Sequence, residues 1–246
     1  MSGSERTAHR LFLEARLQGG ERIACSPEQA NYLLSVLRLG TNAEILAFNG
    51  RDGEWRARLV DVAKRRCALE CVERTRAQTS GPDIHYLFAP LKHARLDYMV
   101  QKATEMGVAK LQPVLTRHTI AARVNTERMR ANAIEAAEQC GILRVPEVAE
   151  PERLDTVLLN WDQTRALVFC DEAAEVASPL AALSRLEGRP LAVLIGPEEG
   201  FDRGEQATLR EKPFALPISL GPRIMRADTA AVAALALINA ALGDWR

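Results

Sequence analysis

The sequence predicts an α/β protein in two parts, a small β-rich part followed by a larger part with a mainly parallel sheet. Over the first 75 residues, apolar and polar residues alternate with a period of two. A polar stretch with Gly and Pro then follows, RAQTSGP at Arg76–Pro82, which is typical of a linker. Beyond it, apolar runs of strand length alternate with helical stretches, which favours parallel strands covered by helices. We therefore expect domains at residues 1–75 and 76–246.

The first part is predicted to be a small β-barrel with one helix. Turn residues, NGRDG over 49–53, are expected to close a hairpin. Ser26 is a good helix N-cap, Pro27 fits the first helical position, and Gly40 is expected to end the helix. The expected strands are residues 11–13, 22–24, 44–48, 54–62 and 67–72.

The second part is predicted to hold five strands and five helices in alternation. Asp202 and Glu205 form a D-x-x-E capping box at the start of one helix. The expected strands are residues 84–89, 111–115, 166–170, 191–195 and 214–220, and the expected helices are residues 96–106, 126–139, 179–186, 204–211 and 229–242.

Composition narrows the function classes. The chain has 246 residues and no apolar segment long enough for a membrane span or a signal peptide, so we expect a cytosolic protein without membrane contact. Its five cysteines are scattered, and no histidine stands at zinc-ligand spacing from one, so we predict no metal site. Neither a G-x-G-x-x-G turn nor a P-loop is present, which disfavours a standard nucleotide site. Residues 1–76 carry 13 basic and 10 acidic side chains, a balance that allows a polyanionic partner.

Two segments stand out as the candidate site: LAVLIGPEEGFD at Leu191–Asp202 and LPISLGPRIMRADTAA at Leu216–Ala231. Each is an apolar run that stops at a Gly-Pro pair and continues into a helix-forming stretch. We expect the two runs to be adjacent strands whose carboxyl ends meet, where open α/β sheets bind ligands. Because Gly196 and Gly221 lack a Cβ, a flat ligand could lie close to the backbone there.

Together with QKATEMGV, EAAEQ…RVPE and the ending ALGDW, these two segments resemble the bacterial 16S ribosomal RNA (uracil-N3)-methyltransferases, a family of the SPOUT superfamily. The resemblance covers nearly the whole chain, and LLSVLRLG…AEILAFNG is similar to the family's PUA-like RNA-binding domain. It implies a trefoil knot, with the helix at 229–242 threaded through an earlier loop, and a homodimer. It also implies that S-adenosyl-L-methionine lies bent in the knot against Leu194, Ile195, Gly196, Pro197, Gly200, Leu216, Leu220, Gly221, Ile224 and Met225.

The implied reaction is methylation of a uracil ring nitrogen in 16S ribosomal RNA, within the small ribosomal subunit. Neutral uracil carries a proton on N3, so the enzyme must favour the deprotonated base. Arg226 is the candidate cation for the developing anion, and Glu198 or Asp228 could accept the proton. Because N3 lies on the pairing edge, the target must be unpaired or flipped out. Candidate contacts to the RNA are Arg38, Lys102, Arg144 and Arg223.

Plainer interpretations remain open for several of these residues. Arg226 and Asp228 could form a surface ion pair, with Asp228 as a helix N-cap. Lys102 and Glu105 have the i,i+3 spacing of a solvated helix pair. Glu199 stands where the family commonly has glycine, so it would be strained if that position needs a positive φ. Two alternative functions also remain: a SPOUT methyltransferase acting on another RNA or on a ribose 2'-hydroxyl, and a non-catalytic RNA-binding module.

Overall fold

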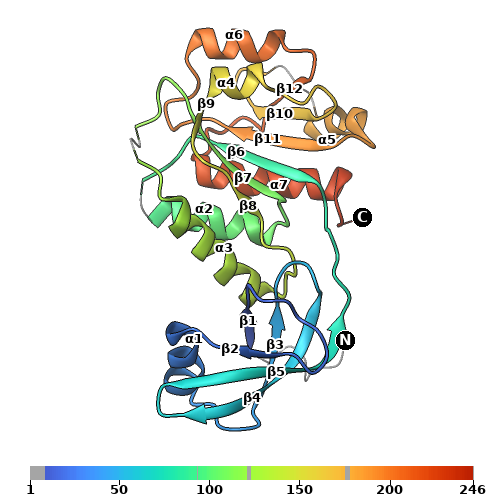
Figure 1. The fold of residues 1–246 in the computed structure, drawn as a ribbon. Coiled ribbons are helices and arrows are strands. Elements are labelled where there is room, and N and C mark those ends of the chain that lie inside the picture. Colours follow the sequence, from blue (N-terminus) through green and yellow to red (C-terminus); the bar gives the residue numbers. More distant parts are fainter. Residues whose placement is uncertain (1–8, 93, 121–122, 175–177, 246) are drawn as a thin grey trace. The chain divides into compact units, whose positions relative to one another are not determined.

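The computed structural model describes residues 9–92, 94–120, 123–174 and 178–245, and the chain folds as two compact units. The first unit comprises Met1–Ser80 and Ala137–Arg144, and the second comprises Gly81–Ala136 and Val145–Arg246. Figure 1 shows the strands and helices of each unit. Among the described residues, no helix has both the length and the apolar character that a membrane crossing requires.

The first unit is built on a five-stranded sheet in the order β1-β3-β4-β5-β2. β1 runs parallel to β3, and the other neighbours are antiparallel. The predicted hairpin turn joins β3 to β4, where Phe48 pairs with Glu54. Alternation places Ile45, Leu59 and Leu69 in the core, where each is no more than 1% exposed. The strands are β1 (Arg10–Phe12), β2 (Arg22–Ala24), β3 (Glu44–Phe48), β4 (Glu54–Ala63) and β5 (Arg66–Arg76).

The helix of the first unit starts as predicted but changes its winding. Ser26 caps α1 (Pro27–Asn31) in a capping box with Gln29. The helix continues as a π-helical turn over Tyr32–Val36, which the sequence pattern did not predict. The left-handed residue that ends it is Arg38, with φ of 56°, rather than Gly40.

A buried ionic cluster holds residues 137–144 to the first unit. Glu54, 3% exposed, accepts hydrogen bonds from Arg10 Nε (2.8 Å) and from Arg76 Nε (2.9 Å) and Nη2 (2.7 Å). Both arginines also donate to backbone carbonyls at the carboxyl end of α3 (Thr126–Cys140), where the last turn of a helix leaves acceptors unpaired. These acceptors are the carbonyls of Ala137, Glu138, Gly141 and Ile142.

The second unit is a parallel sheet in the order β12-β10-β11-β6-β7-β8, with β9 also pairing with β7. One face packs against α2, α3, α5 and α7, and the other against α4 and α6 (Figure 1). The strands are β6 (Ile84–Phe88), β7 (Lys110–Leu115), β8 (Glu147–Val148), β9 (Glu152–Arg153), β10 (Ala166–Cys170), β11 (Leu191–Ile195) and β12 (Ala215–Ile218). The other helices are α2 (Ala94–Glu105), α4 (Leu154–Leu159), α5 (Pro179–Leu183), α6 (Arg203–Glu211) and α7 (Ala227–Leu242).

The expectation that the two key strands are adjacent is wrong. β10 lies between β11 and β12 and pairs with both, with Phe169 opposite Leu194 on one side and Pro217 on the other. All three strands are parallel, so the loops that follow β11 and β12 still leave the same edge of the sheet. The predicted α/β class with flanking helices is confirmed.

Candidate active site at the carboxyl ends of the parallel strands

The first loop of the candidate site follows β11 and turns at Gly196–Gly200. A Cβ on Gly196 would lie 2.9 Å from Phe201 Cε2, so the ring of Phe201 occupies the space that a side chain would need. Gly200 has φ of 73° and donates to the Pro197 carbonyl (2.9 Å), which closes the turn. Gly196 is therefore required by the packing of Phe201, which is a simpler reason than close approach by a ligand.

The strain considered for Glu199 does not arise. Glu199 is exposed and does not have a positive φ, since the left-handed position in this turn is the next residue, Gly200. The loop therefore accommodates a side chain at 199 without a backbone penalty.

A segment after β7 holds this first loop in place. His118 Nδ1 lies 3.0 Å from the Gly200 carbonyl oxygen, and the backbone N–H of Arg117 donates to Glu205 Oε1 (2.8 Å). Glu205 also accepts from the backbone N–H of Asp202, which confirms the predicted capping box at the start of α6. These contacts fix the carboxyl end of the turn.

The second loop, from Ser219 to Arg226, has the features that a backbone-lined ligand site needs. Gly221 has φ of 107°, and no atom lies within 4 Å of the place of its missing Cβ. Among the described residues, the backbone N–H groups of Leu220, Ile224 and Met225 donate no hydrogen bond. Ile224 is 89% exposed. A loop with free peptide donors fits the adenosyl part of S-adenosyl-L-methionine, because peptide groups can hydrogen-bond an adenine edge.

The predicted cofactor residues lie at this edge of the sheet or in the two loops. Leu194 and Ile195 are buried at the end of β11, and Leu216 lies in β12. Gly196, Pro197, Gly200, Leu220 and Met225 are half-buried, and Gly221 and Ile224 are exposed.

Arg95, in the first turn of α2, connects both loop regions. Its Nε donates to Asp228 Oδ2 (2.9 Å), and its Nη1 donates to Glu198 Oε1. Glu198 belongs to the first loop and Asp228 to the first turn of α7, so one guanidinium joins two carboxylates that are distant in sequence. Sequence reasoning missed Arg95, because it stands just before the helix predicted at 96–106, where a lone arginine is usually a solvated side chain.

The surroundings of Asp228 favour its charged form. The hydrogen bond from Arg95 lowers the pKa of Asp228, and burial opposes this effect. Asp228 in turn raises the pKa of Arg95 through the same hydrogen bond. Tyr86, on β6, is fully buried, and this burial raises its pKa well above its ordinary value.

The plainer interpretations of Asp228 are wrong. The residue in the N-cap position of α7 is Arg226, whose side chain makes no capping hydrogen bond, and the ionic partner of Asp228 is Arg95. Arg226 is exposed and has no ion pair with the described residues. Its guanidinium is therefore available to a ligand.

The predicted RNA contacts fall in both compact units. Arg38 is exposed and Arg144 half-buried in the first unit, and Arg223 is exposed in the second. Lys102 Nζ lies 2.7 Å from Glu105 Oε1, which confirms the helix pair. Among the described residues, no group of His, Cys, Asp and Glu side chains is arranged to hold a metal ion.

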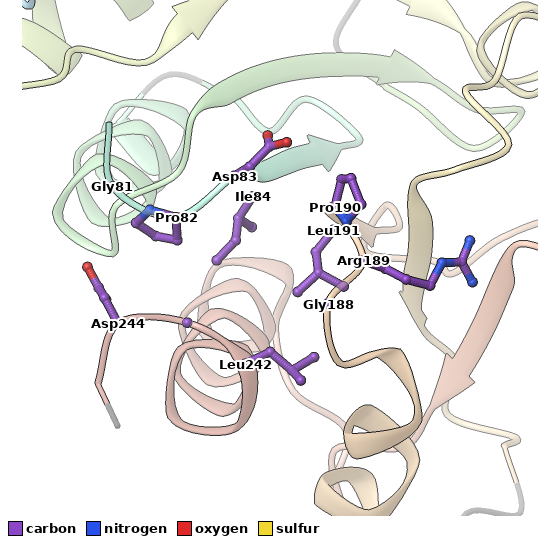
Figure 2. A pocket seen from close by; sticks show the side chains of 11 residues that line it. Gly81, Pro82, Asp83, Ile84, Gly188, Arg189, Pro190, Leu191, Leu242 and Asp244 are labelled. Atoms are coloured by element: carbon purple, nitrogen blue, oxygen red, sulfur yellow. The ribbon is translucent and has the colours of Figure 1, made fainter. Parts of the chain in front are cut away.

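A pocket of about 460 Å³ opens at the opposite edge of the same sheet (Figure 2). It lies at the amino ends of β6 and β11, beside the carboxyl end of α7, and is lined by Ile84, Leu191 and Leu242 with Asp83, Arg189 and Asp244. None of the predicted site residues lines it.

Comparison with known proteins supports the sequence resemblance. A family model described as an RNA methyltransferase domain matches residues 79–239, and one described as an RNA methyltransferase PUA domain matches residues 26–70. The ribosomal RNA small subunit methyltransferase E of Synechocystis is 31% identical over 243 residues, covering 96% of this chain and 78% of that protein. The one from Rickettsia conorii is 29% identical, covering 94% of this chain and 95% of that protein.

Two solved structures share the fold of the whole chain. The ribosomal RNA small subunit methyltransferase E of Neisseria gonorrhoeae, bound to S-adenosyl methionine, has a TM-score of 0.87 and 26% identity, with coverage of 97% of this chain and 100% of that chain. A methyltransferase of Legionella pneumophila, in complex with the same cofactor, has a TM-score of 0.84 and 27% identity, with coverage of 96% and 99%. The chain described here therefore belongs to the RNA methyltransferase family, with the PUA domain of that family in its N-terminal part.

Proposed function

We propose that this protein transfers a methyl group from S-adenosyl-L-methionine to N3 of a uridine in 16S ribosomal RNA of the small subunit. The observation that carries the proposal is that both Gly-Pro loops leave the same edge of the parallel sheet. That edge also carries Arg226, Glu198 and Asp228, the three residues predicted to act on the substrate. Relatives named for small-subunit ribosomal RNA methylation support the substrate class.

The cofactor would lie against the two loops. We propose that the end of β11 and the Gly196–Gly200 turn hold one side of it, and that the segment from Leu216 to Met225 holds the other. The open space at Gly221 and the free peptide N–H groups of the second loop support this placement. When bound, S-adenosyl-L-methionine supplies a methyl group on a positively charged sulfur. Threading of α7 through an earlier loop is part of the proposal.

The protein's task at uracil is to hold N3 without its proton. A carboxylate at the site, Glu198 or Asp228, accepts that proton. Arg226, exposed and unpaired among the described residues, stabilises negative charge on O2 or O4. Holding both reactants in a fixed geometry supplies much of the remaining reduction in the barrier.

The rest of the protein recognises the RNA. We propose that residues 1–75 form an RNA-binding domain, with 76–246 as the catalytic domain, and that Arg38, Lys102, Arg144 and Arg223 contact phosphates. We further propose that the protein acts as a homodimer in the cytoplasm, where its ribosomal substrate is made.

The test is to incubate the protein with labelled S-adenosyl-L-methionine and small subunits from cells that lack the modification. Mass mapping of the labelled nucleoside should find N3-methyluridine at one position. Label on a ribose hydroxyl, or on another RNA, would contradict the proposed substrate. Failure to bind S-adenosyl-L-methionine in calorimetry would favour a non-catalytic RNA-binding module.

A further inference from the structure

Arg95 bridges the carboxylates of Asp228 and Glu198, and these two carboxylates differ in which of their oxygens accept hydrogen bonds. Both oxygens of Asp228 are engaged, Oδ2 by Arg95 Nε and Oδ1 by the backbone N–H of Thr229 (2.9 Å). The Asp228 side chain is 18% exposed. Glu198 is 49% exposed, and among the described residues its Oε2 accepts no hydrogen bond. Glu198 alone presents a free carboxylate oxygen to solvent and to a ligand.

The cost of holding Arg95 in place argues that the bridge has a purpose beyond stability. Its Nη2 is buried and has no hydrogen-bond partner in the part of the chain that the structure describes. A buried donor without a partner costs about 1–3 kcal/mol. Partly exposed ion pairs contribute only about 0–1 kcal/mol each. The stabilisation from the two ion pairs therefore does no more than offset the cost of burying the unpaired Nη2.

We propose that Glu198 is the group that accepts the uracil N3 proton, and that Arg95 is the positioning residue that orients it. This inference rests on the proposed function. In the step, the N3–H bond breaks, the proton bonds to Glu198 Oε2, and the electron pair stays on N3. Arg95 fixes Oε1, so that Oε2 is directed away from the guanidinium. Asp228 fixes the guanidinium in turn, so its carboxylate serves the bridge rather than the proton transfer.

The other titratable groups that face the bridge do not take over this role. Tyr86, on β6, is deeply buried, and burial holds its pKa well above the ordinary value. Burial raises the pKa of Cys170, on β10, to about 12. His118 contacts the carbonyl of Gly200 in the same loop, so its contribution is tested with a separate variant.

The test compares conservative variants of the full-length protein in the methylation assay on hypomethylated small subunits. Glu198→Gln keeps an oxygen for Arg95 but removes the base, so kcat should fall about 100-fold or more. Asp228→Asn also keeps an acceptor for Arg95 and should lose less than about tenfold. Arg95→Gln should lose about tenfold, and Arg95→Lys should recover part of that loss. Arg203→Gln, an exposed arginine at the start of α6, is the matched control and should be unaffected.

A double-mutant cycle gives the decisive readout. Because Arg95 acts through Glu198, the Arg95→Gln change should have no further effect on kcat once Glu198→Gln is present. His118→Gln should lose less kcat than Glu198→Gln. Affinity for S-adenosyl-L-methionine, measured by calorimetry, should stay within about twofold in the Arg95→Gln and Glu198→Gln proteins.

Three results would overturn the inference while the wild-type protein methylates N3: multiplicative losses in the double mutant, a larger loss in Asp228→Asn than in Glu198→Gln, or a loss in His118→Gln as large as that in Glu198→Gln. Inactivity of the wild-type protein on hypomethylated subunits would instead count against the proposed function. Loss of cofactor affinity in Arg95→Gln would reassign Arg95 to cofactor binding.

Discussion

Glu54→Gln should destabilise the first compact unit strongly. The Glu54 carboxylate is 3% exposed and accepts three hydrogen bonds from Arg10 and Arg76 at 2.7 to 2.9 Å. Breaking a buried pair by removing one partner costs about 3–5 kcal/mol, because the remaining charge is left uncompensated. The Arg76 side chain is 37% exposed and can be partly hydrated, while the Arg10 side chain is 9% exposed. We therefore expect a loss of about 3 kcal/mol, the lower end of that range.

The assay is urea unfolding at neutral pH, with Glu44→Gln as the matched control. The Glu44 side chain is 40% exposed and faces Arg56 and Arg58 at 3.6 and 3.3 Å, so its loss should cost less than about 1 kcal/mol. Hydrogen exchange of the amides at 137–144 should also speed up in Glu54→Gln, since Arg10 and Arg76 bind carbonyls there. Equal losses in the two variants would refute the reasoning.

The pH dependence provides a second check on Glu54. Burial alone would raise the pKa of Glu54, but the hydrogen bonds from Arg76 and Arg10 outweigh it and lower the pKa below its ordinary value. The stabilisation is therefore fully present above the unfolded pKa of about 4.3 and is lost as the pH falls through the folded value. The difference between wild type and Glu54→Gln should shrink over that acid range.

Three further predictions concern the proposed site. Gly221→Ala should weaken binding of S-adenosyl-L-methionine in calorimetry, because φ of 107° is strained for alanine. Gly188→Ala is the control: Gly188 is also left-handed but lies at the opposite edge of the sheet, so its substitution should leave the affinity unchanged. Equal affinities in both variants would contradict the role of the second loop. Arg226→Ala should abolish methyl transfer and leave cofactor affinity largely intact, and normal turnover would remove its electrostatic role. Arg38→Ala should weaken binding of the small-subunit RNA and reduce the salt slope of log K by about 1, and an unchanged slope would mean that Arg38 meets no phosphate.

Local signals in the sequence were enough for most strands and helix starts. β2, β3, β10 and β11 have the predicted bounds, because alternating or continuous apolar runs between turn residues leave little choice of register. The caps at Ser26 and Asp202 form as predicted, since each depends on residues within one turn. The short α4, β8 and β9 were missed, because segments of two to six residues carry too little periodicity to recognise.

Long-range contacts could not be predicted in this way. The strand order that puts β10 between β11 and β12 is set by pairing across the sheet, which no local pattern encodes. Arg95 is linked to Asp228, 133 positions away, so its role emerges only when α2 and α7 are packed together. The two Gly-Pro loops stand out in the sequence because their composition is a local feature. Arg95, which joins the first loop to the start of α7, has no such local signal.

The ionic cluster around Glu54 bears on how the chain folds during synthesis. The first unit occupies the amino-terminal end of the chain, yet the carbonyls that complete the hydrogen bonding of Arg10 and Arg76 belong to residues 137–142. Because the ribosome releases the amino terminus of a chain first, these two guanidinium groups stay hydrated until α3 has left the ribosomal exit tunnel. The first unit therefore completes its hydrogen bonding only after residues 137–142 have been synthesised.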